Sequence, residues 1–292
     1  MRNIVVFNSV FIISLFFATS CSSNANSKPQ EMIHLKYPVV FVHGIVAHDR
    51  DSPVAFWGRI PDTLRSHGVN IFFGNTDAWG TYESNATILK DTIENVLAQT
   101  QAERVNIIAH SKGGIDSRYL IWNYDFGDKV ASLTTISTPH HGAELADFIA
   151  NRDIIYTETA MHIISVFGQL YGDRYPNLYA VLYELTTENM AEFNQKVLQD
   201  EMVYYQSLYT AMNRPLDDAL FSRTYAYIYR VGGPNDGVVS AKSATWGSNA
   251  RRIVRNGISH TQIVDIQKRS VDGVDTPSLY IDILRDLSLK GF

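Results

Sequence analysis

Short apolar runs rich in β-branched and aromatic residues recur along the chain, separated by polar stretches and by helical patterns. They cover residues 38–43, 69–73, 105–109, 131–136, 225–231 and 251–254. Runs of this length and composition predict buried β-strands. Because helical segments separate them, the sequence predicts an α/β fold with a mostly parallel sheet and helices on both faces.

Two segments have the spacing of a helix with one apolar face. In the first, apolar residues recur at i, i+4, i+7 and i+8, namely Leu89, Ile93, Val96 and Leu97. The second spans residues 276–290. Both are expected to pack on the sheet, and residues 36–292 are therefore predicted to form one α/β domain.

The N-terminus has the order of a secretory signal, which we assign to residues 1–20. A basic residue, Arg2, precedes an apolar run over 4–18 that ends in small residues. At about 15 residues this run is short for a membrane span. We therefore expect an exported protein.

Cys21 directly follows this signal and is the only cysteine of the chain. The sequence around it is similar to a lipoprotein box, whose cysteine becomes a lipidated N-terminus. This predicts a cell-envelope lipoprotein anchored at Cys21, and ordinary cleavage near Ala25 followed by secretion is the alternative. Residues 21–35 are mostly polar and are expected to form a tether.

Composition narrows the functional classes. Of the 292 residues 45% are hydrophobic, enough for a sizeable core. The 25 Lys and Arg against 30 Asp and Glu leave a formal net charge of −5. The chain thus lacks the basic excess with which nucleic-acid binders neutralise phosphates, so no nucleic-acid partner is expected. A single cysteine also excludes an intrachain disulfide and a Cys-rich zinc site.

A candidate nucleophile, Ser111, lies just beyond the predicted strand 105–109. Small residues flank it at −2 and +2, namely Ala109 and Gly113. This arrangement is typical of a nucleophile elbow, a tight strand-to-helix turn that projects the serine hydroxyl beside the helix N-terminus. The alternative is a serine that only caps a helix.

Other segments supply the rest of a hydrolase site. The backbone N–H groups of Ile45 and Lys112 are the predicted donors of an oxyanion hole. Asp236 and His260 each follow a predicted strand, where a parallel sheet displays its site. The order Ser111, Asp236, His260 is the chain order of α/β-hydrolases, and the Lys112 side chain is expected to face solvent.

At these residues the chain resembles the secreted bacterial triacylglycerol lipases of the α/β-hydrolase superfamily. The matching stretches are 37–44, 105–119, 130–142, 235–240 and 258–260. The resemblance implies an α/β-hydrolase fold and a serine hydrolase that acts on lipid esters at a lipid–water interface.

The same resemblance implies a role for each triad residue. Ser111 is the nucleophile, His260 is the general base and then the general acid, and Asp236 orients the imidazole. No cofactor is required for this chemistry.

Several of these lipases hold a structural calcium ion, with one aspartate two residues after the catalytic histidine. Here that position is Gln262, and the nearest acids before the catalytic aspartate are Asp217 and Asp218. Because an amide is a weaker calcium ligand than a carboxylate, activity is expected to be independent of calcium. A zinc site is not expected either, since the adjacent His140 and His141 cannot easily share one metal, and one of the two is expected to pack beneath the site.

An insertion over about 144–222 is expected to set substrate choice as a helical cap or lid. Within it a helical stripe faces one side, formed by Ala160, Ile163, Ile164, Phe167, Leu170 and Tyr171. The stripe is interpreted either as a mobile lid or as a fixed cap helix.

Three functions follow from these patterns. The first is a lipase on acylglycerols, and the second is a carboxylesterase or phospholipase with the same triad. The third is a non-catalytic envelope lipoprotein with a binding role, which the complete set of Ser111, Asp236 and His260 disfavours.

Overall fold

The computed structural model describes residues 31–49, 55–150 and 172–292. The signal, Cys21, most of the tether and the stripe over 160–171 lie outside the described residues. Residues from Met32 to Phe292 cluster into one unit. In the described part of this unit, no helix combines the length and apolarity that crossing a membrane requires.

Six described strands form one parallel sheet in the order β2-β1-β3-β4-β5-β6. Their bounds are β1 Val39–Val42, β2 Ile71–Phe73, β3 Val105–His110, β4 Val130–Ile136, β5 Tyr204–Tyr209 and β6 Ala250–Arg252. The strand order leaves β1, β3, β4 and β5 in the interior of the sheet. The predicted parallel sheet is confirmed.

Five predicted runs coincide with strands, and the prediction over 225–231 is wrong. That run lies in a helix, α8 (Ser222–Val231). Its aromatic residues favour a strand by propensity, but the inward side chains, Tyr225 and Ile228, are three apart, and Tyr229 is exposed. Tertiary packing of one helical face therefore overrides the local preference.

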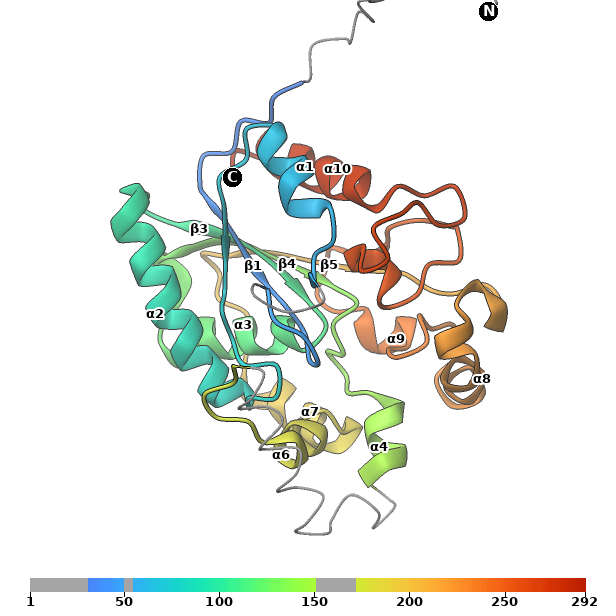
Figure 1. Ribbon diagram of the computed structural model, residues 1–292. Helices are drawn as coiled ribbons and strands as arrows, with labels where there is room; N and C mark the ends of the chain where they lie inside the picture. Colours follow the sequence, from blue (N-terminus) through green and yellow to red (C-terminus); the bar gives the residue numbers. More distant parts are fainter. Residues whose placement is uncertain (1–30, 50–54, 151–171) are drawn as a thin grey trace, which may run out of the picture. The chain divides into compact units, whose positions relative to one another are not determined.

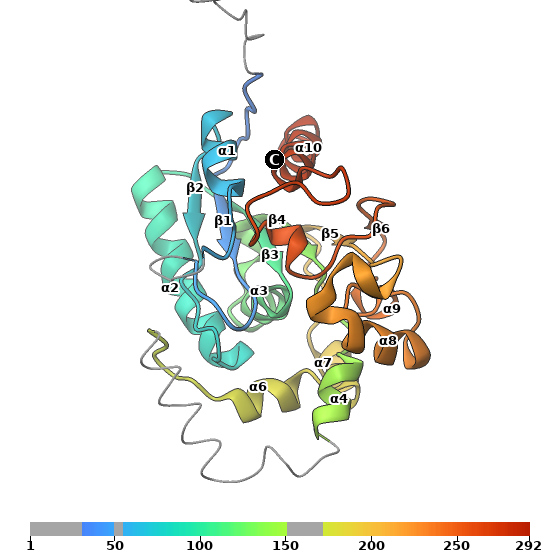
Figure 2. The ribbon, with the colours of Figure 1, turned by 45° about the vertical axis from the view of Figure 1, so that its right-hand side comes forward.

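Helices cover both faces of the sheet, as Figures 1 and 2 show. On one face lie α1 (Ile60–Ser66) and α10 (Thr276–Leu289), which contact each other. On the other lie α2 (Tyr82–Thr100) and α3 (Lys112–Asn123), which also pack together. Both helical segments expected from the apolar spacing, around 89–97 and over 276–290, are confirmed as α2 and α10.

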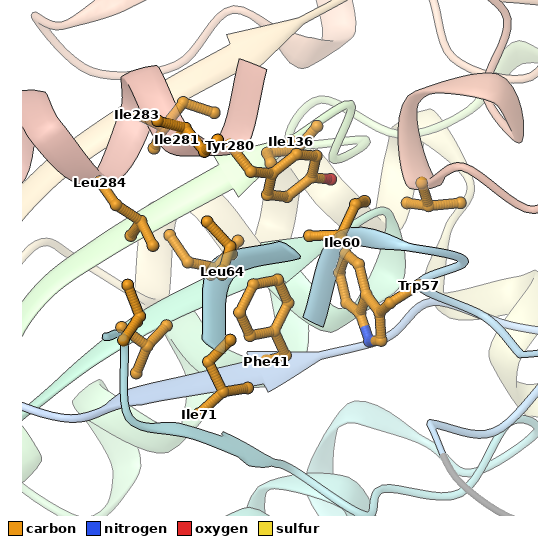
Figure 3. Close-up of a cluster of buried hydrophobic side chains, with 14 of the residues drawn as sticks. Phe41, Trp57, Ile60, Leu64, Ile71, Ile136, Tyr280, Ile281, Ile283 and Leu284 are labelled. Atoms are coloured by element: carbon orange, nitrogen blue, oxygen red, sulfur yellow. The ribbon is translucent and has the colours of Figure 1, made fainter. Parts of the chain in front are cut away.

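The core on the α1–α10 side is rich in aromatic side chains (Figure 3). The rings of Phe41, from β1, and Trp57 meet edge to face with centroids 4.8 Å apart. Tyr280, from α10, packs on both rings and donates its hydroxyl to the Ile263 carbonyl at 3.1 Å. Burying one side chain of the size of Phe41 contributes about 1.5–3 kcal/mol, so this cluster fixes the sheet beneath the site.

Three helices form a cap cluster beyond the carboxyl ends of the strands (Figures 1 and 2). They are α4 (Glu144–Ala150), α6 (Leu178–Glu184) and α7 (Thr187–Lys196), and Ile115 of α3 packs into the same cluster. The predicted insertion over 144–222 needs correction, because β5 lies inside it as an interior strand. The cap helices that the structure describes end before Tyr204.

Short elements complete the described fold. They are α9 (Ala241–Ala244) and the 3-10 turns η1 Phe126–Asp128, η3 Pro215–Asp217, η4 Ala219–Phe221 and η5 Gln262–Val264. The turn η5 begins two residues after His260, and η3 and η4 precede α8.

Candidate active site

Ser111 lies in the turn between β3 and α3, in the conformation that an elbow requires. Its φ of 53° and ψ of −131° are costly for a residue with a side chain. Its N–H donates to the Ile136 carbonyl of β4 at 3.0 Å, which holds the turn against the sheet. Backbone strain of this kind persists only where the surrounding structure imposes it. The sequence motif around Ser111 predicted this tight turn.

Close backbone packing explains the glycines around this turn. A Cβ atom on Gly113 would lie 2.4 Å from the His43 carbonyl oxygen, and one on Gly44 would lie 2.8 Å from Ser111 Cβ. Side chains at these positions would force the turn and the end of β1 apart. The glycines therefore bring the loop after β1 directly against Ser111.

This approach places the two predicted oxyanion donors on the segments that meet at Ser111. Lys112 is the first residue of α3, where backbone N–H groups have no partner within the helix. Ile45 follows Gly44 in the loop that touches Ser111. Within the described ranges, neither N–H donates a hydrogen bond, so both are available to an oxyanion.

Asp236 and His260 are brought together as the sequence order predicted. His260 Nδ1 lies 2.8 Å from Asp236 Oδ2, and the His260 N–H donates to the Asp236 carbonyl at 2.9 Å. The other carboxylate oxygen, Asp236 Oδ1, accepts from the N–H groups of Val238 and Val239 at 3.0 and 2.8 Å. With both oxygens engaged, the carboxylate holds the imidazole with Nδ1 toward it and leaves Nε2 without a hydrogen bond in the described structure.

His110 forms the wall behind His260. Their ring centroids are 4.4 Å apart, and Phe56 and Trp57 contact the other sides of the His110 ring. Burial holds the pKa of His110 well below its usual range, so the ring stays neutral. This contact places His260 beside the elbow, because His110 immediately precedes Ser111. In the described structure Ser111 Oγ makes no hydrogen bond; such catalytic bonds often tighten only when substrate is bound.

The Lys112 side chain does not face solvent, contrary to the expectation from the sequence. It is 2% exposed, and its ammonium donates to Asp116 Oδ1 at 2.5 Å. Asn85 donates to Asp116 Oδ2 at 2.9 Å and accepts from the Asp77 N–H at 2.9 Å. Lys112 and Asp116 are four residues apart on α3, and their burial arises where α3 packs against α2.

Two carboxylates, those of Asp77 and Asp173, hold the segment that begins at residue 172 against the loop after β2. Asp77 accepts from the N–H groups of Arg174 and Tyr175 at 2.9 and 2.7 Å. In exchange, Asp173 accepts from the N–H groups of residues 78 and 79 at 2.8 and 2.9 Å. His48, in the loop after β1, lies 2.8 Å from Asp173 Oδ1. The cap is therefore fastened to the loop that carries Ile45.

One of the two adjacent histidines is buried, as expected. His140 is fully buried, stacks on Trp246 at a centroid distance of 4.7 Å, and contacts the Arg118 guanidinium at 3.1 Å. Burial lowers the pKa of Arg118 to about 9 and holds that of His140 well below its usual range. His141 turns away and contacts the Thr245 carbonyl at 3.2 Å. The two rings thus have different partners, and only that of His140 is buried.

The residues at the expected calcium position do not fit a cation. Asp217 accepts from the N–H groups of Asn213 and Arg214 and from the Arg214 guanidinium, at 2.7 to 3.0 Å. Gln262 offers an amide in place of a carboxylate, and that amide donates to the Asp217 carbonyl at 3.1 Å. Throughout the described ranges, no cluster of three or more His, Cys, Asp or Glu side chains has the geometry to hold a metal ion.

Sequence comparisons point to lipid-acyl hydrolases. The family model described as palmitoyl protein thioesterase matches residues 38–266. Over 263 residues the chain is 28% identical to triacylglycerol lipase 2 of Saccharomyces cerevisiae, covering 82% of this chain and 75% of the yeast protein. Over 174 residues it is 33% identical to a triacylglycerol lipase of Pseudarthrobacter phenanthrenivorans, covering 55% of this chain and 53% of that protein. The second alignment thus spans about half of each protein.

Solved structures confirm the fold. A lipase of Staphylococcus hyicus aligns with a TM-score of 0.66 and 18% identity, covering 91% of this chain and 98% of that chain. A lipase of Bacillus licheniformis aligns with a TM-score of 0.62 and 22% identity, covering 87% and 94%. At this level of identity the similarity shows the fold alone, which is the expected α/β-hydrolase fold.

Proposed function

The chain belongs to the palmitoyl protein thioesterase family. We propose that it is a serine hydrolase that cleaves carboxylic esters of lipids and acts as a triacylglycerol lipase. The observation that carries the proposal is the hydrogen bond between Asp236 and His260 beside the strained backbone of Ser111. The names of the sequence relatives supply the substrate class.

The proposed reaction is a two-step acyl transfer. His260 Nε2 takes the proton of Ser111 as Oγ attacks the ester carbonyl, and Asp236 stabilises the imidazolium that forms. The oxyanion is bound by the N–H groups of Ile45 and Lys112. His260 then protonates the leaving alcohol, and water repeats the sequence on the acyl-enzyme.

The α3 N-terminus assists this chemistry through its position. Its unpaired N–H groups and partial positive charge lie where negative charge develops on the substrate oxygen. No step uses a metal or another cofactor, and we infer that calcium is not required, because Asp217 and Gln262 are already committed to partners in the protein.

A second candidate is cleavage of long-chain acyl thioesters, which the family name favours. The same nucleophile, base and oxyanion donors serve an ester and a thioester, since both reactions pass through the same acyl-enzyme. Carboxylesterase and phospholipase activity also remain compatible with the triad. The groove and the leaving group decide among these substrates.

The test compares hydrolysis of triacylglycerols and p-nitrophenyl esters of rising acyl length with that of a palmitoyl thioester and a phospholipid. Ser111→Ala serves as the blank. Fast cleavage of long-chain triacylglycerol that is lost in the variant supports the lipase. Preference for the thioester or the phospholipid supports those alternatives. Cleavage of none of them, together with no labelling of Ser111 by a fluorophosphonate, supports the binding lipoprotein.

We also propose that the protein is exported and anchored in the cell envelope through lipid on Cys21. The lipoprotein-like box is the observation behind this proposal. Labelled fatty acid is expected in the wild-type protein and not in Cys21→Ser. Label that persists in the variant contradicts the anchor, and an unlabelled protein in the medium supports simple secretion.

A further inference from the structure

Two segments far apart in the sequence are joined at the loop that carries His260. The side-chain amide of Gln262 is 3% exposed and uses both of its ends. Its Oε1 accepts from the Ser259 N–H at 2.9 Å, and its Nε2 donates to the Asp217 carbonyl at 3.1 Å. The amide thus bonds the histidine loop to the segment 213–218, which lies between β5 and η4 and contains η3.

A second link lies on the other side of His260. The Ser259 hydroxyl, which is fully buried, donates to Asp218 Oδ2 at 2.7 Å. The other oxygen of Asp218 accepts from the Leu220 N–H at 3.1 Å. The residues one before and two after the histidine are therefore both tied to neighbouring residues of the same segment.

The loop is also fixed from the helix that follows. The Thr276 hydroxyl, at the start of α10, donates to the Gln262 carbonyl at 3.0 Å. A buried polar group that loses its partner is costly, and Gln262, Ser259 and Thr276 each make their bonds out of water. The loop therefore has one well-defined position, and its Nδ1–Asp236 contact depends on that position.

We propose that Gln262 is a positioning residue for the reaction. Its amide, together with the Ser259–Asp218 hydrogen bond, fixes the His260 loop on the segment 213–218 directly, without a bridging cation. Gln262 does not touch the reacting atoms; it acts through the loop that holds the imidazole. This inference rests on the proposed triad of Ser111, Asp236 and His260.

Substitution of the amide by a group of similar shape isolates its hydrogen bonds. Gln262→Met removes the acceptor and the donor, whereas Gln262→Glu keeps the acceptor for Ser259 and loses the donor to Asp217. Gln267→Met is the matched control, because Gln267 is an exposed glutamine of the same loop. The full-length protein is assayed with a soluble p-nitrophenyl ester, and active sites are counted by titration with a fluorophosphonate.

Positioning and simple stability give different results in this assay. The proposal expects kcat per titrated site to fall about 10- to 100-fold in Gln262→Met, with KM changed by less than about threefold. The kcat of Gln262→Glu is expected to lie between the values for Gln262→Met and the wild type. The kcat of Gln267→Met is expected to match that of the wild type. Fewer titratable sites with an unchanged kcat per site would mean that the amide only stabilises the fold, and this overturns the proposal.

Two additions complete the test. A chelator is expected to leave the wild type fully active, and added calcium is expected not to restore Gln262→Met. A reversible loss of wild-type activity in chelator overturns the direct cross-link. If the wild type neither hydrolyses the ester nor reacts with the fluorophosphonate, the proposed function itself fails, which is a different result from an active Gln262→Met.

Discussion

The Lys112 ammonium donates to Asp116 Oδ1 at 2.5 Å, one helical turn along α3, and both side chains are shielded from water. Lys112 is also the residue whose backbone N–H faces the proposed oxyanion. The first turn of α3 therefore combines a proposed oxyanion donor with a buried ion pair, and the carboxylate of that pair also accepts from Asn85 of α2.

A double-mutant cycle tests this ion pair. Lys112→Met and Asp116→Asn each leave a buried charge without its partner, and each is expected to cost about 3–5 kcal/mol of unfolding free energy. The loss of unfolding free energy in the double variant is expected to be smaller than the sum of the two single losses by about 1–3 kcal/mol. Urea unfolding of the four proteins measures the coupling, and additive losses would contradict it.

The glycine at the start of α3 is expected to be essential for the elbow. In Gly113→Ala the new methyl group would lie 2.4 Å from the His43 carbonyl oxygen and 2.6 Å from that of Val42. The turn must open, so a stability loss of about 1–3 kcal/mol and a loss of esterase activity are expected. Gly273→Ala is the control for activity, since no atom lies within 4 Å of its added Cβ. Its φ of 76° predicts some loss of stability from backbone strain alone, with esterase activity retained. An active, stable Gly113→Ala would show that β1 and the elbow can separate.

Replacement of the triad acid separates orientation from folding. Asp236→Asn keeps the shape of the side chain but turns an amide toward His260 Nδ1, which favours the wrong tautomer. A fall in kcat of about 10⁴-fold is expected, with little change in thermal stability. Steady-state kinetics and a melting curve on the same preparation check this, and activity within about tenfold of the wild type would remove Asp236 from the triad.

The contact between His48 and Asp173 makes one part of the stability depend on pH. The hydrogen bond to Asp173 raises the pKa of His48 in the folded protein. A raised pKa means that this contribution is fully present below the unfolded value of about 6.5 and is lost as pH rises through the folded pKa.

The expected effect is a difference in unfolding free energy between the wild type and His48→Gln. Because His48 is only half-buried, His48→Gln is expected to cost about 1 kcal/mol below pH 6 and less above pH 8. Urea unfolding of both proteins across this range gives the difference directly. Equal differences at both ends of the range would mean that the contact does not depend on the charge of His48.

Some of the fold could be predicted because its signals are local. The runs that became β1, β3 and β4 are short, apolar and β-branched, and they lie in the interior of the sheet, where such runs are unambiguous. The motif around Ser111 is equally local, because the turn restricts the residues at positions 109 and 113 directly. The order of Ser111, Asp236 and His260 along the chain predicted a triad, and the structure brings Asp236 and His260 into contact.

Other features could not be predicted from the sequence, because they depend on contacts between residues that are far apart in the chain. The composition of the run 225–231 predicts a strand, but tertiary packing stabilises it as the helix α8. The strand β5, over Tyr204–Tyr209, lies within the stretch expected to be an insertion. In both cases the local preference is weak, and neighbours supplied by other segments decide the outcome.

What the sequence alone determined is the set of strands with clear apolar runs, the elbow and the identity of each triad candidate, since each is signalled by residues within a few positions of it. Only the tertiary structure decided that the Lys112 side chain is buried, that His110 backs His260 and that Gln262 reaches Asp217. The partners of Gln262 and His110 lie 45 and about 150 residues away, and Lys112 is buried where α3 meets α2. Such contacts form when the sheet and its loops assemble, and no local pattern specifies them.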